Sequence, residues 1–321
     1  MQNLKFKVSI IGTGAVGSSI AYALMLKNLA SEIVLIDKNK SVSDAEQLDL
    51  NCRLNNISSC DIYSGNYKDI KDSDVIIVTC GRPRKLNETR LDMTYDNLKI
   101  AKDVSNEIKN NYTKGIVLVI SNPVDIITYK MTKWLGLPQG KVFGTGCALD
   151  SLRFVNVLSN FIGKDNYSKI EAMVIGEHGD SQVPLWSNVK VDDVNIEEFC
   201  KSKGIYFDEE IKQKLNDLVI NMGSNIIKGK GRTNYGIASC VANIVDAVKN
   251  DDKQTLSFSY AIDDKYDLKN LALSVPCTIG KEGIESVHIY DLDDNEKQIL
   301  FKSAEKIKNT LEKVEKKDFN L

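Results

Sequence analysis

The sequence predicts an α/β protein in two parts, a parallel sheet covered by helices followed by an α+β domain. Short apolar runs alternate with segments of helical periodicity through the first half of the chain, which is the pattern of a parallel sheet with helices on both faces. A glycine-rich turn joins the first run to the first helix. The alternation stops near Thr145, so we expect one domain over residues 1–145 and a second over residues 146–321.

The first half is expected to hold buried strands separated by helices. The strands are short apolar runs rich in β-branched residues: Lys7–Ile11, Glu32–Ile36, Val75–Thr79 and Ile116–Ile120. The helices repeat apolar residues at helical spacing: Val16–Asn28, Val42–Asn51 and Thr94–Asn111. Ligands of such a sheet bind beyond the carboxyl ends of its strands.

The second half mixes the two patterns. Helices are expected over Leu149–Phe161, Asp208–Lys228 and Asp294–Val314. Strands are expected over Met173–Ile175, Leu256–Ala261, Leu271–Ile279 and Ser286–Asp291. Because no long linker or low-complexity segment separates the halves, we expect them to pack closely, with a cleft between them.

Composition excludes several classes of function. The net charge is −2 and lysines are interspersed with acidic residues, so no overall field favours nucleic acid. The chain shows no apolar run of membrane length and no signal-peptide pattern. Its seven cysteines are scattered, without metal or disulfide spacing, which indicates reduced thiols. We expect a cytoplasmic protein without a metal site, a nucleic-acid partner or a membrane partner.

A glycine-rich run lies between the first strand and the first helix. In Gly12-Thr13-Gly14-Ala15-Val16-Gly17, the glycines permit a tight turn and close approach of the backbone to a pyrophosphate. Asp37 ends the next strand, where an acid that binds ribose hydroxyls and repels a 2′-phosphate is expected. The run therefore predicts a Rossmann-type domain that binds NAD rather than NADP. The alternative is a glycine turn beside a surface aspartate.

Arginine is scarce and clustered. The chain holds 36 lysines and six arginines, of which Arg82, Arg84 and Arg90 fall within nine residues. Lysine already serves solubility, whereas arginine is needed where a planar fork grips a carboxylate or phosphate. The segment predicts a loop that binds an anion; the alternative is a solvated basic loop.

One of the two histidines is a candidate for proton transfer. His178 follows the apolar run Met173–Ile175 between two glycines, which suits a catalytic loop, and imidazole can give and take a proton near neutrality. Asp150 is its candidate partner. Asp150 and Arg153 are one helical turn apart, and this spacing alone also fits an ordinary ion pair. His288, in an alternating strand pattern, is expected to be structural.

Together these motifs resemble the L-lactate/L-malate dehydrogenase family over essentially the whole chain. The resemblance rests on the order and spacing of Gly12–Gly17 with Asp37, Glu88–Asp92, Ser121–Asp125, Leu149–Phe154, Gly176–Ser181 and Lys230–Ala238. The stretch Gln182–Ser187 is similar to the lactate-dehydrogenase-like branch, which is usually tetrameric. The resemblance therefore implies a homo-oligomer, with a tetramer favoured over a dimer.

The resemblance also implies roles for the matching positions. It makes His178 the proton donor and acceptor and Asp150 its partner. It assigns Arg153 to the substrate carboxylate and Arg90, on a loop, to the reacting carbonyl. The other substrate contacts that it implies are Asn122 and Thr233, with a cis bond at Asn122–Pro123. The other cofactor contacts that it implies are Gly81, Asn97, Ile120, Ser121 and Asn122.

The substrate prediction depends on one further charge. Arg84 stands where lactate enzymes of the family carry Gln and malate enzymes carry Arg. Leaving Arg84 unpaired beside the methyl group of pyruvate would cost roughly 2–5 kcal/mol. The sequence therefore favours an NAD-dependent L-malate dehydrogenase acting on a small dicarboxylate. The alternatives are an L-lactate or broader 2-hydroxyacid dehydrogenase, with which Thr233 agrees, and a non-catalytic NAD-binding protein. Arg82 has no assigned role.

A regulatory site of some relatives is not expected. Bacterial lactate enzymes that fructose 1,6-bisphosphate activates resemble one another in an Arg and a His that correspond to Val155 and Glu171 here. Because neither residue is a cation, the sequence predicts no such activation.

Overall fold

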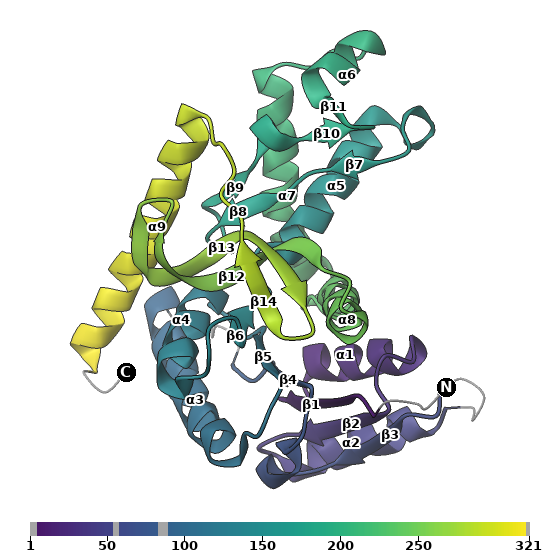
Figure 1. Cartoon of the computed structure of the whole chain (residues 1–321), viewed down its shortest axis with the longest axis vertical. Coiled ribbons are helices and arrows are strands. Elements are labelled where there is room, and N and C mark those ends of the chain that lie inside the picture. Colours follow the sequence, from purple (N-terminus) through teal and green to yellow (C-terminus); the bar gives the residue numbers. More distant parts are fainter. Residues whose placement is uncertain (1–4, 54–57, 83–88, 319–321) are drawn as a thin grey trace.

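The structure is a computed structural model that describes residues 5–53, 58–82 and 89–318; the side chains of Arg90 and Asp263 are also outside the description. Figure 1 shows the larger of the two described sheets passing through the molecule, with helices packed along it. The family of parallel strands lies at one end of this sheet and the antiparallel strands at the other. Within the described ranges, no helix combines the length and the apolar character needed to cross a membrane.

The first half forms a parallel sheet in the order β3-β2-β1-β4-β5-β6. The bounds of its strands are β1 Lys7–Ile11, β2 Glu32–Ile36, β3 Asp61–Ser64, β4 Val75–Val78, β5 Ile116–Val119 and β6 Val142–Gly144. Every residue of β4 and β5 is buried, because helices cover both faces of a parallel sheet. This strand order is that of the Rossmann fold, as predicted. The sequence reasoning missed β3, which carries Asp61 and Tyr63 at the sheet edge, and the three-residue β6.

Four helices cover these strands: α1 Ala15–Leu26, α2 Lys40–Asn51, α3 Arg90–Asn111 and α4 Val124–Leu135; a 3₁₀ turn spans Tyr67–Ile70. The predicted helix at 94–111 begins earlier, because the Thr89 hydroxyl accepts a hydrogen bond from the Asp92 amide and caps the helix at Arg90. The sequence reasoning did not predict α4. This helix ends at Gly136, whose φ of 61° is a left-handed conformation that glycine adopts without strain.

The second half contains helices and mainly antiparallel strands. Its helices are α5 Ala148–Ile162, α6 Ile196–Ser202, α7 Glu209–Lys230, α8 Tyr235–Asn250 and α9 Asp294–Lys317, with 3₁₀ turns at Lys164–Asn166 and Trp186–Asn188. Its strands are β7 Ile170–Glu171, β8 Val174–Gly176, β9 Gln182–Pro184, β10 Lys190–Val191, β11 Val194–Asn195, β12 Gln254–Lys265, β13 Leu268–Gly280 and β14 Gly283–Val287. The predicted α+β character is confirmed.

One predicted strand is misplaced. The sequence reasoning expected Ser286–Asp291, whereas β14 spans Gly283–Val287 and residues 288–293 form no strand. The register follows from the tight hairpin, in which Gly280 pairs with Gly283. Ile289, which completed the apolar alternation in the sequence, is exposed. His288 is structural, as expected, since its Nε2 lies 2.7 Å from the Thr278 hydroxyl.

The two halves are joined through the sheet itself. Gly144 of β6 pairs with Ser259 of β12, so the parallel strands continue into the antiparallel ones. A Cβ atom at Gly144 would lie 2.4 Å from the Thr128 hydroxyl, which explains the glycine at this junction. One hydrophobic core extends from the parallel strands to α8, α9, β12 and β13, and a second lies among α5, α6 and α7. The division at residue 145 stays a prediction.

Candidate active site

The glycine-rich run has the geometry of a dinucleotide cradle. Gly12 has a φ of 97°, and a Cβ there would lie 2.7 Å from the Cys80 amide nitrogen. A Cβ at Gly17 would lie 1.9 Å from the Gly12 carbonyl oxygen, whereas one at Gly14 would meet no described atom within 4 Å. Among the described residues, no side chain caps the start of α1 at Gly14. An uncapped helix N-terminus beside open glycine backbone fits the pyrophosphate of NAD.

Asp37 lies against this run at the end of β2. Its carboxylate accepts hydrogen bonds from the Thr13 amide at 2.8 Å, the Asn39 amide at 2.9 Å and the Thr13 hydroxyl at 3.2 Å. A carboxylate has about four acceptor positions, so capacity for a ribose hydroxyl remains. Lys40 is bound to Asp44 at 2.9 Å and to the Ser64 carbonyl at 3.0 Å. These contacts fix the Lys40 ammonium group away from a role in binding a 2′-phosphate.

Asn97 ties two segments that border the site. Its side-chain oxygen accepts from the Arg82 amide at 2.9 Å, and its nitrogen donates to the carbonyls of Asn122 at 2.8 Å and Arg82 at 3.2 Å. Asn97 is buried. Asn122–Pro123 is a cis peptide bond, as the resemblance implied. The predicted contacts of Asn97, Gly81, Ile120 and Ser121 with the cofactor stay predictions.

Of the three clustered arginines, the structure describes the side chain of Arg82 alone. The guanidinium of Arg82 pairs with Asp96 of α3, through Nε at 2.8 Å and a terminal nitrogen at 2.6 Å. This pairing supplies the contact that sequence reasoning could not assign. Arg84 lies outside the described residues. Arg90 begins α3, and its side chain is outside the description.

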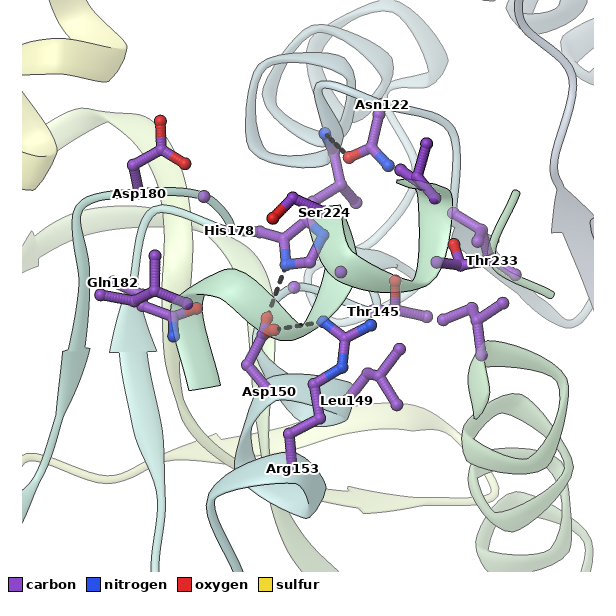
Figure 2. A pocket seen from close by; sticks show the side chains of 18 of the residues that line it. Asn122, Thr145, Leu149, Asp150, Arg153, His178, Asp180, Gln182, Ser224 and Thr233 are labelled. Carbon is purple, nitrogen blue, oxygen red and sulfur yellow. Dashed lines mark hydrogen bonds and ion pairs between the residues drawn. The ribbon is translucent and has the colours of Figure 1, made fainter. Parts of the chain in front are cut away.

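Asp150 joins the predicted catalytic residues (Figure 2). Its Oδ2 lies 2.6 Å from His178 Nδ1, and its Oδ1 accepts from Arg153 at 2.9 Å. Asp150 stands in the first turn of α5, and Arg153 follows one turn later. His178 lies just beyond β8, whose last residue is Gly176. The sequence left open whether Asp150 pairs with Arg153 or with His178. In the structure Asp150 does both: it forms an ion pair with Arg153 and holds the ring of His178.

Burial and charge shift the pKa values of this pair in opposite directions. Burial alone would lower the pKa of His178, but the Asp150 carboxylate outweighs it and the pKa is raised. Burial would raise the pKa of Asp150, but His178 and Arg153 outweigh it and the pKa is lowered. The Asp150 side chain is only 4% exposed, while that of His178 is 27% exposed. The pair therefore favours a protonated ring that remains partly accessible.

A cavity of about 340 Å³ opens above the pair. His178, Arg153, Asp150, Asn122 and Thr233 all line it, together with Val16 and Ile120 from the nucleotide side. Figure 2 shows Asn122 and Thr233 on the wall beside the imidazole. The cavity thus brings the predicted proton donor and anion-binding residue together with the predicted nucleotide-binding segment.

One wall of the cavity comes from α7 and was missed. It consists of Ile220, Gly223, Ser224 and Ile227, and this spacing of three and four residues places them on one helix face. A Cβ at Gly223 would lie 3.7 Å from a terminal nitrogen of Arg153. The adjacent small residues Gly223 and Ser224 were the available signal, but nothing in the sequence joined them to His178. The described lining is completed by Val124, Thr145, Gly146, Leu149, Gly179, Asp180, Gln182 and Ile237.

Cys147 lies beside the pair without belonging to its chemistry. Cys147, Asp150 and His178 offer ligand atoms within 4.8 Å of one another. Burial raises the pKa of the Cys147 thiol well above its usual range, so the thiolate that a metal requires is disfavoured. Asp150 already binds Arg153 and His178. The arrangement instead suits proton transfer to an oxygen held next to Arg153.

Known proteins share this arrangement across the chain. The model of the lactate/malate dehydrogenase NAD-binding domain matches residues 6–144, and that of the lactate/malate dehydrogenase alpha/beta C-terminal domain matches residues 147–318. An L-lactate dehydrogenase of Clostridium perfringens is 40% identical over 302 residues, which is 94% of this chain and 95% of that protein.

Two solved structures have the same fold. The minor L-lactate dehydrogenase of Enterococcus mundtii, in a ligand-bound form, has a TM-score of 0.91 and 32% identity over 97% of this chain and 98% of its own. The malate dehydrogenase of Cryptosporidium parvum has a TM-score of 0.90 and 32% identity over 98% of this chain and 100% of its own. The chain therefore belongs to the lactate/malate dehydrogenase family of oxidoreductases, and NAD is its cofactor.

Proposed function

We propose that the chain reduces a 2-oxo acid with one carboxylate and oxidises the corresponding L-2-hydroxy acid, with pyruvate and L-lactate as the leading pair. The observation that carries this proposal is the position of Arg153, whose guanidinium lines the cavity and binds the carboxylate that also holds His178. One fork matches one carboxylate. The names of relatives such as the Clostridium perfringens enzyme support the same substrate class.

In this proposal each residue performs one task. NAD supplies hydride transfer when bound. Arg153 binds the substrate carboxylate in the cavity and so directs the neighbouring carbonyl toward His178. The imidazolium gives its proton to the carbonyl oxygen as negative charge develops there, and in the reverse direction the neutral ring removes the hydroxyl proton. Asp150 stabilises the charged ring and holds Nδ1, so that Nε2 serves the substrate.

Malate and oxaloacetate, the pair that the sequence favours, are the second candidate pair. The observation behind this candidate is Arg84, which would meet a second carboxylate if its loop lies over the cavity. The Cryptosporidium parvum malate dehydrogenase has nearly the same fold, so fold alone does not separate the two substrates. The choice depends on whether a second guanidinium enters the site.

Kinetics on matched proteins tests both candidates. Initial rates of NADH oxidation with pyruvate and with oxaloacetate should give a higher kcat/KM for pyruvate in the unmodified chain. A preference for oxaloacetate that Arg84→Gln reverses would instead support malate. Arg82→Gln is the matched control, since Arg82 pairs with Asp96 and its removal should not alter the ratio of the two substrates. Turnover of neither acid would reject both candidates.

We further propose that the chain forms a homo-oligomer, with a tetramer favoured. Support comes from a groove of about 540 Å³ that α1, α2 and α8 line, where Tyr22, Leu26 and Tyr235 are 53%, 43% and 73% exposed. Exposed apolar patches of this kind mark interfaces. Light scattering coupled to size-exclusion chromatography should give a molar mass that is two or more times the 35.8 kDa of one chain. A monomer would contradict the proposal. The cytoplasmic location stays a prediction.

A further inference from the structure

A second buried carboxylate contacts the catalytic loop, from α4 rather than from α5, which carries Asp150. Asp125 stands in the first turn of α4 and is 3% exposed. Its Oδ2 accepts a hydrogen bond from the main-chain amide of His178 at 2.8 Å. An aspartate at a helix N-cap usually binds amides of its own helix, but Asp125 is the second residue of α4 and the N-cap is Pro123. Here the carboxylate instead holds the backbone of a residue 53 positions away.

The position of Asp125 links the two sides of the cavity. Asn122, which lines the cavity, precedes it by three residues in the same motif. The preceding loop amide, that of Glu177, donates to the Ser303 hydroxyl of α9 at 2.6 Å. Side chains from α4 and α9 thus fix two successive amides of the loop that carries His178. The direction of the imidazole depends on this backbone, because only its χ angles lie between the amide and the ring.

The carboxylate keeps an unusual environment. The Ser259 hydroxyl of β12 also lies against this carboxylate. Burial raises the pKa of Asp125 to about 6. The titratable groups that face it are His178 and Glu177 on the loop and the Cys147 thiol at the start of α5; Lys306 of α9 pairs with Glu177 at 2.6 Å. Burying a charge costs free energy unless the charge is paired or hydrogen-bonded.

We propose that Asp125 is a positioning residue for proton transfer: its carboxylate holds the His178 main chain so that the imidazole faces the substrate, and its charge stabilises the protonated ring together with Asp150. The proposal rests on the proposed function for its kinetic readout alone. It differs from a purely structural role, because removing the charge should change the titration of His178 in the absence of any substrate.

The substitution Asp125→Asn keeps the shape and an oxygen acceptor but removes the charge. We expect kcat for 2-oxo acid reduction to fall about 10- to 100-fold, because a neutral amide oxygen holds the His178 amide less firmly and the protonated ring loses a nearby anion. NADH affinity should change little. The pKa of His178 should fall, because one of the two anions that favour the imidazolium is lost. Thr128→Val, one turn along α4, removes a buried hydroxyl without touching the loop and should change neither quantity.

The two histidines of the chain make the second readout direct. NMR of protein labelled at histidine Cε1 gives one signal for His178 and one for His288, and His178→Asn assigns them. Asp125→Asn should lower the pKa of His178, and the His288 signal serves as the internal reference. Unchanged titration of His178 with unchanged kcat would overturn the proposal, whether or not the melting temperature falls. Asp125→Ser is used if the Asn variant does not fold. Failure of both oxo acids as substrates would refute the proposed function but leave this readout intact.

Discussion

Asp150 holds His178 through Nδ1 at 2.6 Å, which leaves Nε2 as the ring nitrogen that can serve a substrate. The same carboxylate binds Arg153 at 2.9 Å. The group that supports the proposed proton donor is therefore also the group that orients the guanidinium proposed to bind the substrate anion. A substrate held by Arg153 is placed relative to His178 through a single buried side chain, and changes at Asp150 should affect both functions.

Asp150→Asn should lower kcat/KM for the 2-oxo acid by about 10²–10⁴-fold, because an amide neither stabilises the imidazolium nor fixes the correct tautomer. The pKa of His178 should fall, since Asp150 is what raises it. Stopped-flow measurement of NADH oxidation checks the first effect and histidine NMR the second. Asp103→Asn, on the exposed side of α3, is the control. Normal turnover by the Asp150→Asn variant would show that the pair is only structural.

The pH dependence should have opposite signs in the two directions. Reduction uses the protonated ring, so kcat/KM for the 2-oxo acid is full at low pH and is lost as pH rises through the pKa of His178. Oxidation uses the neutral ring, so kcat/KM for the 2-hydroxy acid rises through the same pKa. Because the Asp150 carboxylate raises that pKa, both midpoints should lie above the ordinary value of about 6.5. Midpoints below this value would contradict the assignment.

Arg153→Lys should impair substrate binding despite keeping the charge. Lysine cannot form the planar two-point contact that a carboxylate accepts, and a shorter reach would also weaken the contact with Asp150. We expect kcat/KM for the oxo acid to fall by at least about 10²-fold, while NADH binding measured by fluorescence stays the same. Equal efficiency of the two proteins would remove Arg153 from the substrate site.

Asp37→Ser should relax the choice between NAD and NADP. The carboxylate that repels a 2′-phosphate is then absent, so the ratio of kcat/KM for NADPH to that for NADH should rise. Affinity for NADH should fall as well, because Asp37 also holds the Thr13 amide. Asp61→Ser, exposed at the opposite end of the β2–β3 pair, controls for loss of a surface charge on the same sheet. An unchanged cofactor ratio would show that another group discriminates.

Fructose 1,6-bisphosphate should not activate the enzyme. Val155 and Glu171 line a cavity of about 550 Å³ in which Lys190 is the cation among the described lining residues. A bisphosphate needs several cations, and Glu171 would repel it. Initial rates at subsaturating substrate, with and without the bisphosphate, check this; a clear increase in rate would contradict it.

The sequence predicted those parts of the candidate site that depend on contacts between residues close together in the chain. The Asp150–Arg153 spacing, the glycines around His178 and the Gly12–Gly17 run each act within a few residues, so their geometry followed from helix and turn rules. Contacts made between distant segments were not predictable. The face of α7 at Gly223 and Ser224 meets Arg153 only through packing of the second half. The pairing of Arg82 with Asp96 and the contact of Asp125 with the His178 amide depend in the same way on tertiary structure.

The most direct test of the account is the single-turnover rate of NADH oxidation in His178→Asn, with pyruvate and oxaloacetate each supplied at saturation. Asparagine is close to the imidazole in size but cannot donate the proton through an ionised ring. The account predicts that the unmodified enzyme turns over a 2-oxo acid and that the variant loses at least about 10²-fold in rate, with NADH affinity unchanged. A variant that turns over at the rate of the unmodified enzyme would contradict the assignment of His178 as the proton donor.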